Sequence, residues 1–432
     1  MRKMRSMKSS KFLLIMLLFV FVFSTIAGCG NGDSPTGADG ERPDELTFDD
    51  ADTEWTMQSI WVPSITLWRG DKYFVDLINR QALGDLYIDF NEGGSLVSDA
   101  DELFDAVRTG TVDMASDWPS YWEGRDEAFG LVTSTPMVLT PGDYMLWYWQ
   151  AGGLELIQDL YAEYGLVWFP HSVTSPESGQ RTNVPINDAE DFDGQRLRQC
   201  GRRQSDILED MGAGAIFMGG ADIYLALDRG TIDGAEFSVP EVDWSMGLQE
   251  VTDYLVVPGW HQPGPVSGIM VNEDSWNDLP DRVKYLFKEA AMASMMWSWT
   301  YYEYSTIDYH QRFIDDGMEV TRIDDETLEE IQEIAWEYLI EDARDNPTHA
   351  KIAFSQVKYL YEFQEWREAQ EPFMFGRNPS GLDETYEELR EIAQDHGVYD
   401  EVIELEASVR ERMEEGQHWE PGTTFEGSPI LQ

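Results

Sequence analysis

A ten-residue phrase occurs twice in this chain, 120 residues apart. Residues 106–115 read AVRTGTVDMA and residues 226–235 read ALDRGTIDGA. Each copy has an apolar segment of helical character, then Gly, Thr, a β-branched residue and Asp. Gly after a helix and a short β-branched stretch after the Gly are typical of a helix that leads into a strand. The repeat therefore predicts two similar α/β lobes, each directing a strand end toward a common cleft.

Acidic and aromatic residues follow both copies, and they are candidates for lining that cleft. They are Asp117, Trp118, Tyr121 and Trp122 after the first copy, and Glu236 and Phe237 after the second.

The chain is long and strongly acidic. Its 432 residues are enough for two domains with extensions. It has 82 Asp and Glu against 30 Lys and Arg, a formal net charge of −52. This charge excludes nucleic acid as a partner, because nothing supplies a basic face. Such a chain repels itself at low salt, whereas molar salt shortens the Debye length to about 3 Å. We therefore expect an exported protein of a salt-loving organism, the alternative being an acidic secreted protein of a mesophile.

The N-terminus has the features of a secretion signal. Basic residues precede an unbroken apolar run over 12–23, which is too short to span a membrane. The sequence Ile26-Ala27-Gly28-Cys29 follows and resembles the lipobox of bacterial lipoproteins, in which the Cys is lipidated and becomes the first mature residue. We predict lipidation at Cys29 and a lipid-anchored, extracytoplasmic protein. The alternative is an ordinary signal peptide with an incidental Cys.

Besides Cys29 only Cys200 is present, so no intramolecular disulfide framework exists, and we expect Cys200 to be a small buried residue.

The rest of the chain divides into four further segments. The predicted division lists a lipoprotein signal peptide over 1–28, a flexible tether over 29–53, lobe I over 54–172 with about 240–276, lobe II over 173–239 with about 277–376, and an acidic helical extension over 377–432. Strands are expected over 86–90, 111–118, 166–173, 196–200, 232–239 and 318–323. A helix over 276–316 is long enough to span both lobes.

Arg198 is the first candidate for a ligand-binding residue. A planar guanidinium pairs with both oxygens of a carboxylate, so a single Arg in a cleft can both attract and orient an organic acid. Arg202 and Arg203 open the next predicted helix and are weaker candidates. The alternative for each is a surface ion pair.

Glu236 is the second candidate, because it follows the small residues Gly234 and Ala235 at a predicted strand end. A buried carboxylate there needs an Arg or a cation as a partner. With Glu177, Gln262 and backbone carbonyls it could hold a hard cation through oxygen. A simple Glu236–Arg ion pair is an equally good interpretation.

Motifs for catalysis are missing from the sequence. The six His have no zinc-like spacing, and we expect them to have surface or packing roles. There is no P-loop, GxSxG, dinucleotide fingerprint or HExxH. We therefore expect a binding protein without an organic cofactor, and not an enzyme.

Four longer segments resemble the solute-binding component of TRAP transporters, of the DctP type. They are DFDGQRLRQCG, IYLALDRGTIDGAEFSVPEVDWSMGL, PGWHQPG and MVNEDSWNDLP. The resemblance runs from about residue 55 to residue 376. Within the family the chain is most similar to the 2-oxo acid and lactate binders, as the GAEF, PGWHQPG and AGGLEL segments indicate.

The resemblance implies a fold and a set of roles. The fold is a two-lobe periplasmic-binding-protein-like α/β fold, with crossing strands and a long lobe-spanning helix. Arg198 would bind the substrate carboxylate, Glu236 with the Phe237 backbone would face a metal or the substrate, and Gln262 would be a further metal ligand. Tyr121 and Trp122 match an aromatic pair at the edge of the first lobe. Glu177 is near a position where relatives carry a polar ligand. Arg181 departs from the family pattern and could serve a second acidic group.

The implied function is capture of a small monocarboxylate, a 2-oxo or 2-hydroxy acid, with Na⁺ or Ca²⁺ bridging it to the protein. The implied partners are the TRAP permease membrane subunits, and a homodimer is left open. The alternatives are an extracytoplasmic sensor for organic acids and a binder of a different carboxylate, such as a dicarboxylate.

Overall fold

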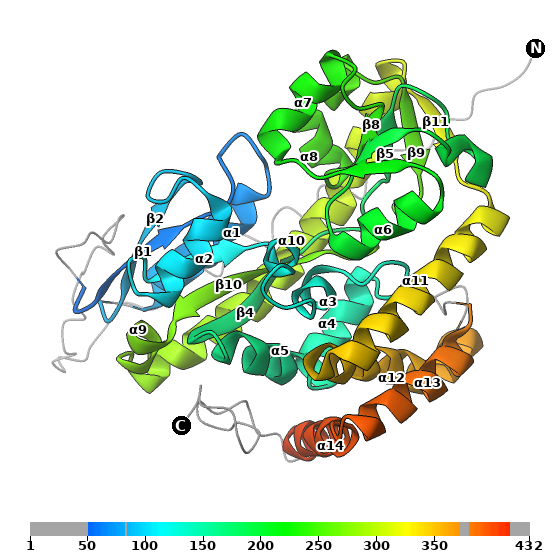
Figure 1. The fold of residues 1–432 in the computed structure, drawn as a ribbon. Helices are drawn as coiled ribbons and strands as arrows, with labels where there is room; N and C mark the ends of the chain where they lie inside the picture. Colours follow the sequence, from blue (N-terminus) through cyan, green and yellow to red (C-terminus); the bar gives the residue numbers. More distant parts are fainter. Residues whose placement is uncertain (1–50, 83, 371–379, 415–432) are drawn as a thin grey trace, which may run out of the picture. The chain divides into compact units, whose positions relative to one another are not determined.

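The computed structural model describes residues 51–82, 84–370 and 380–414 (Figure 1). The predicted signal peptide, Cys29 and most of the tether lie outside the described residues, as do residues 415–432. Among the helices that are described, none combines the length and the apolar character that a membrane span requires.

Two separate sheets organise the described residues. The first sheet has the order β2-β1-β3-β10-β4 and the second has the order β11-β9-β5-β8-β6-β7. The first sheet comprises β1 (Glu54–Gln58), β2 (Tyr87–Asn91), β3 (Met114–Asp117), β4 (Leu166–Val173) and β10 (Val266–Asn272). The second comprises β5 (Gln180–Thr182), β6 (Arg196–Arg198), β7 (Gly214–Ile216), β8 (Gly234–Ala235), β9 (Tyr254–Val257) and β11 (Glu319–Arg322). The predicted two-lobe α/β fold is confirmed, and each sheet forms the centre of one lobe.

Helices connect and cover the strands. They are α1 (Trp68–Gln81), α2 (Ala100–Arg108), α3 (Phe129–Thr133), α4 (Pro141–Gln150), α5 (Gly153–Ala162), α6 (Arg202–Asp210), α7 (Gly220–Asp228), α8 (Pro240–Ser245), α9 (Glu273–Asn277), α10 (Asp281–Asp315), α11 (Asp325–Asp345), α12 (Pro347–Gln370), α13 (Leu382–Asp395) and α14 (Tyr399–Glu414). The last two form the predicted helical C-terminal extension.

The repeated phrase has the same local structure in both lobes. In each copy the Thr amide donates a 2.8 Å hydrogen bond back to the helix, from Thr111 to the Ala106 carbonyl and from Thr231 to the Ala226 carbonyl. The Gly before each Thr has a positive φ, 73° in the first copy and 63° in the second, which a residue with a side chain rarely adopts.

The Asp of each copy fastens the following strand to its parallel neighbour. Asp113 Oδ2 accepts a 2.8 Å hydrogen bond from the Thr56 amide of β1, and Asp233 Oδ2 accepts one of 2.9 Å from the Arg196 amide of β6. The two copies are therefore equivalent units, and Glu236 occupies the place that Ser116 has in the first lobe.

Two extended segments cross between the lobes side by side. Residues 174–179 leave β4 for β5, and residues 258–265 lead from β9 back to β10. The Glu177 amide donates a 3.1 Å hydrogen bond to the Gln262 carbonyl. The approach requires Gly at two positions, because a Cβ at Gly179 would lie 1.8 Å from a Val256 oxygen and one at Gly259 would lie 1.9 Å from the Glu177 oxygen.

The long helix α10 is the third connection between the lobes. It packs against β4 and α1 of the first lobe and against α8 of the second, and Figure 1 shows it running from the first sheet toward the second. The helix predicted over 276–316 differs at its start. α9 ends at Asn277 and α10 begins at Asp281, because Pro280 occupies the N-cap.

The predicted lobe boundaries differ from the structure in two segments. β9 was included in lobe I, but it pairs with β5 and β11 of the second sheet. α11 and α12 were assigned to lobe II, and Ile331 and Ala335 of α11 do pack in the core of the second lobe. Trp336 and Leu339 of α11 and Phe354 of α12, however, belong to the core that contains the first sheet. Amphipathic patterns show that a segment has a buried face, but they do not show which core receives it.

Asp117 at the end of β3 anchors an aromatic core in the first lobe. Its carboxylate accepts hydrogen bonds from the Trp122 and Trp168 indole nitrogens, both at 3.2 Å, and from the Tyr161 hydroxyl. Asp117 is fully buried, and burial raises its pKa to about 6, although the three donors oppose the shift. The side chain fixes the packing of three large rings.

Asp117→Ala should lower the free energy of unfolding by roughly 3–5 kcal/mol, because three buried donors lose their acceptor. Denaturant unfolding in high salt measures this. Asp105→Ala is the matched control, since this carboxylate is about half exposed and pairs with Arg108 and Arg125; its change should stay within about 0.5 kcal/mol. Equal effects of the two substitutions would contradict the anchoring role of Asp117.

Candidate functional site

Arg198 lies at the end of β6, beside Ala235 of the parallel strand β8. Its side chain is 1% exposed. Nη1 donates hydrogen bonds of 2.8 Å to both the backbone oxygen and Oε1 of Glu236, and Nε donates one of 3.1 Å to the Met218 carbonyl. The guanidinium carbon lies 5.4 Å from the centre of the Phe237 ring and 5.8 Å from that of Phe217. A fixed cation is therefore held between aromatic rings, which favours cation–π contact.

Glu236 has one carboxylate oxygen in use and one without a hydrogen-bond partner. Oε1 accepts from Arg198, from the Gln199 amide side chain at 3.2 Å and from the Cys200 backbone amide. Oε2 is buried without a hydrogen bond and lies 3.9 Å from His261 Nε2. Burial raises the pKa of Glu236, while Arg198 opposes the increase.

The two crossing segments bring Glu177 and His261 close to Glu236, and they also carry Gln262. Glu177 Oε2 is 2.9 Å from His261 Nε2, and Glu177 Oε1 has no partner. Gln262 Oε1 is also buried without a hydrogen bond. Burial and the charges of Glu236 and Asp243 raise the pKa of Glu177. Burial and the nearby Arg side chains lower that of His261 to about 3, so this imidazole is neutral at pH 7.

These groups fit the donor set of a cation. One ligand atom each from Glu177, Glu236 and His261 lies within 4.8 Å of the others, and all three residues are buried. Buried oxygens without partners are unfavourable, and oxygen is what Ca²⁺ and Na⁺ bind. A cation here would be held by Glu177 and Glu236, with neutral His261 beside them.

Arg181 already has a partner in the structure. Its Nη2 lies 2.8 Å from Asp243 Oδ2 and donates a 2.7 Å hydrogen bond to Ser178 Oγ. The guanidinium carbon is 4.7 Å from the centre of the Phe313 ring. Both charges of the pair are fully buried. Asp243 therefore occupies the place that a second acidic group of a ligand would need.

The predicted aromatic residues have different surroundings in the structure. Phe237 lies at Arg198, and Tyr121 faces Phe217 with 6.1 Å between the ring centres. Tyr121 lines a cavity of about 220 Å³ together with Gln199, Cys200 and Phe217. Trp122, in contrast, is fully buried and donates to Asp117, so its ring belongs to the core of the first lobe and not to the cleft.

Several residues at the site were missed from the sequence. His261 was expected to have a surface or packing role, but it contacts Glu177. Its position next to Gln262, between Trp260 and Pro263, was the available signal. Gln199 and the Cys200 amide hold Glu236. A contact through a backbone amide, such as that of Cys200, cannot be predicted from the type of residue.

Cys200 is buried, as expected, and has no disulfide partner among the residues the structure describes. Burial raises the pKa of its thiol to about 12. A thiol in this state is not a nucleophile at pH 7.

The chain matches known proteins over most of its length. The family model of DctP, bacterial extracellular solute-binding protein, family 7, matches residues 58–344. A monocarboxylate 2-oxoacid-binding periplasmic protein of Nostoc sp. is 28% identical over 313 residues, which are 72% of this chain and 83% of the relative.

Solved structures share the fold. A TRAP transporter solute-binding protein from Bordetella bronchiseptica, described with copurified calcium and picolinate, has a TM-score of 0.71 and 24% identity, covering 74% of this chain and 95% of the other. One from Pseudoalteromonas atlantica, described with bound sodium and pyruvate, has a TM-score of 0.66 and 23% identity, covering 74% and 97%. The match to the family model spans well over half of this chain and includes both lobes and the crossing segments. The chain therefore belongs to the DctP family, family 7 of the bacterial extracellular solute-binding proteins.

Proposed function

We propose that this protein is the substrate receptor of a TRAP-type transporter and that it binds a small monocarboxylate together with a cation. The single observation that carries the proposal is the buried group formed by Arg198, Glu236 and Glu177, to which we add Gln262 because the family resemblance implies it. It combines one guanidinium with carboxylate and amide oxygens that lack partners. Arg198 recognises the ligand carboxylate, and Glu177, Glu236 and Gln262 hold the cation.

The charges of the buried groups favour this combination. Arg181 and Arg198 carry two positive charges, and Glu177, Glu236 and Asp243 carry three negative charges when ionised, so the group has a net charge of −1. A monocarboxylate alone would increase this imbalance in a medium of low dielectric. A divalent cation bound with a monocarboxylate brings the sum to zero, which favours Ca²⁺ over Na⁺.

A 2-oxo or 2-hydroxy acid suits such a site because its carboxylate and its second oxygen can share one hard cation. The cation supplies positive charge to both oxygens and needs no redox chemistry. The relatives support this class, because their descriptions pair a 2-oxo acid with sodium and picolinate with calcium. The Arg181–Asp243 pair argues against a dicarboxylate.

Binding takes place by closure of the two lobes. The cation-holding residues Glu177 and Gln262 are on the crossing segments, whereas Arg198 and Glu236 are at strand ends of the second lobe. Tyr121 approaches from the first lobe. Closure therefore completes the site and excludes water, which strengthens the contact between Arg198 and a carboxylate.

The receptor acts outside the cytoplasm, in partnership with TRAP permease subunits in the membrane. We propose that Cys29 carries a lipid and that residues 29–53 tether the receptor to the membrane. The excess of acidic residues indicates adaptation to high salt.

Arg198→Ala should weaken binding of pyruvate by at least about 30-fold, because a buried charge pair with the ligand is lost. Isothermal titration calorimetry in molar salt with excess Ca²⁺ measures the change. Arg196→Ala is the matched control, since Arg196 lies two residues away on the same strand but is exposed and pairs with Asp233. The affinity of this variant for pyruvate should stay within twofold of the wild-type value. Circular dichroism verifies that both variants are folded. Unchanged affinity in the Arg198 variant would refute its role.

Removal of the cation should abolish acid binding in the wild-type protein, and Ca²⁺ should restore it. Elemental analysis before and after chelation, followed by calorimetry, provides the measurement. Glu177→Gln keeps an oxygen ligand but removes one charge, so we expect a greater loss of affinity for Ca²⁺ than for Na⁺. If the chelated protein contains no metal and still binds pyruvate with its original affinity, the proposal that a cation bridges the acid to the protein is wrong.

A further inference from the structure

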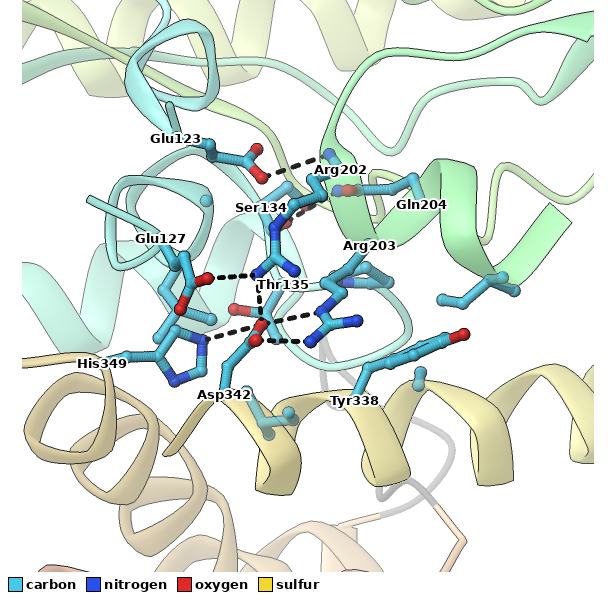
Figure 2. A pocket seen from close by; sticks show the side chains of 16 residues that line it. Glu123, Glu127, Ser134, Thr135, Arg202, Arg203, Gln204, Tyr338, Asp342 and His349 are labelled. Atoms are coloured by element: carbon cyan, nitrogen blue, oxygen red, sulfur yellow. Dashed lines mark hydrogen bonds and ion pairs between the residues drawn. The ribbon is translucent and has the colours of Figure 1, made fainter. Parts of the chain in front are cut away.

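A second cluster of charges lies outside the ligand site, where α6 meets α11 and the end of the 3₁₀ helix at 119–122 (Figure 2). Asp342 of α11 is its centre. Arg202 Nη2 lies 2.7 Å from Asp342 Oδ2, and Arg203 Nε donates to the same oxygen at 2.8 Å. His349 Nε2 is 3.8 Å from it. The Asp342 side chain is only 5% exposed, and that of Arg203 is 18% exposed.

This cluster joins the two lobes. Arg202 and Arg203 begin α6, which packs in the core of the second lobe through Ile207 and Leu208. Arg202 also contacts residues of the first lobe. The Arg202 amide donates a 3.1 Å hydrogen bond to Glu123 Oε2, and its guanidinium is 3.6 Å from Glu127.

Neighbouring contacts make the joint close-packed. Gln204 Nε2 donates a 3.3 Å hydrogen bond to the Ser134 carbonyl, and the Arg203 guanidinium lies 4.2 Å from the centre of the Tyr338 ring. The residues enclose a cavity of only about 30 Å³, which is room for about one water molecule. The Arg203–Asp342 pair is therefore largely shielded from solvent and responds less to salt than exposed pairs do, whereas the Arg202 side chain is 35% exposed.

One short segment connects this cluster to the ligand site. Arg198 is at one end of residues 198–202 and Arg202 is at the other. Between them, the Cys200 amide donates to Glu236, while the Arg202 amide donates to Glu123. The segment that recognises the ligand therefore also carries the contact to the opposite lobe.

We propose that Arg202 and Arg203 with Asp342 and Glu123 form a clasp that closes when the lobes close and slows release of the ligand. The proposal rests on the proposed function, because it concerns how long the receptor retains its ligand. Truncating a buried, hydrogen-bonded charge pair mainly raises a dissociation rate. A second ion pair also joins the lobes, between Arg69 of α1 and Glu241 of α8 at 2.7 Å. Loss of the clasp should therefore speed ligand release only in part.

The test uses two variants of the clasp and one control in the otherwise complete protein. Asp342→Asn removes the central charge, and Arg202→Gln removes a partly exposed partner that folding is expected to tolerate. Glu388→Gln is the control, because Glu388 pairs with Arg344 of the same helix α11 but ties it to α13 and not to the other lobe. Stopped-flow measurements with pyruvate and excess Ca²⁺ give the association and dissociation rates.

Both clasp variants should release pyruvate about 10-fold faster, with association rates and the Ca²⁺ requirement little changed, and the control should match the wild type. We expect the melting temperature without ligand to stay the same, because in this proposal the clasp forms only when the lobes close, while the shift caused by pyruvate should shrink. Wild-type release rates in both clasp variants would overturn the clasp. The clasp would also be overturned if the substitutions lowered the melting temperature equally without and with pyruvate, because that result would show a purely structural role. Failure of the wild type to bind pyruvate or lactate would overturn the proposed function and, with it, this role of the clasp.

Discussion

A guanidinium and a carboxylate that are both removed from water determine how this molecule is organised. Arg198 and Glu236 lie on neighbouring parallel strands, and together they leave one carboxylate oxygen without a partner. Burial of charge is costly unless each charge is matched. The crossing segments meet this requirement only in part, because they add Glu177 and Gln262, which bring more oxygen and one more negative charge. The site is thus arranged for a cation and an anion together, and two lobes are needed to surround them.

The chain is strongly acidic, and several of its few basic residues lie beside buried carboxylates. The chain has only 30 Lys and Arg, and Arg198, Arg181 and Arg203 all lie at buried or nearly buried carboxylates. Arg suits these places because its planar fork makes several directed hydrogen bonds while it stays charged.

Much of the fold follows from local sequence patterns. The repeated phrase predicted two equivalent helix-to-strand units, and the Thr and Asp hydrogen bonds show the same geometry in both. The strands β5 and β7 were not predicted, because three residues carry too little pattern and their pairing is long-range. β9 and β10 were not predicted as strands either. The predicted lobe I contained both segments, which is correct for β10 but not for β9, because a short apolar run does not reveal which sheet receives it.

The site shows the same limit. Arg198 and Glu236 were identified from residue type and from resemblance, and the structure places them in contact. Trp122 was placed at the cleft because it follows the first copy of the repeat and matches an aromatic pair of the family, yet it is fully buried at the end of a turn of 3₁₀ helix. Arg202 and Arg203 were considered only as weaker ligands for a carboxylate. Their partner Asp342 is about 140 residues away in sequence, and no local pattern predicts the contact.

A crystal structure of the protein grown with Ca²⁺ and a 2-oxo acid would test most directly whether the site binds a cation and an anion together. We expect one cation in contact with Glu177, Glu236 and Gln262, and the acid carboxylate on Arg198. An acid bound elsewhere, with no cation between Glu177 and Glu236, would contradict it.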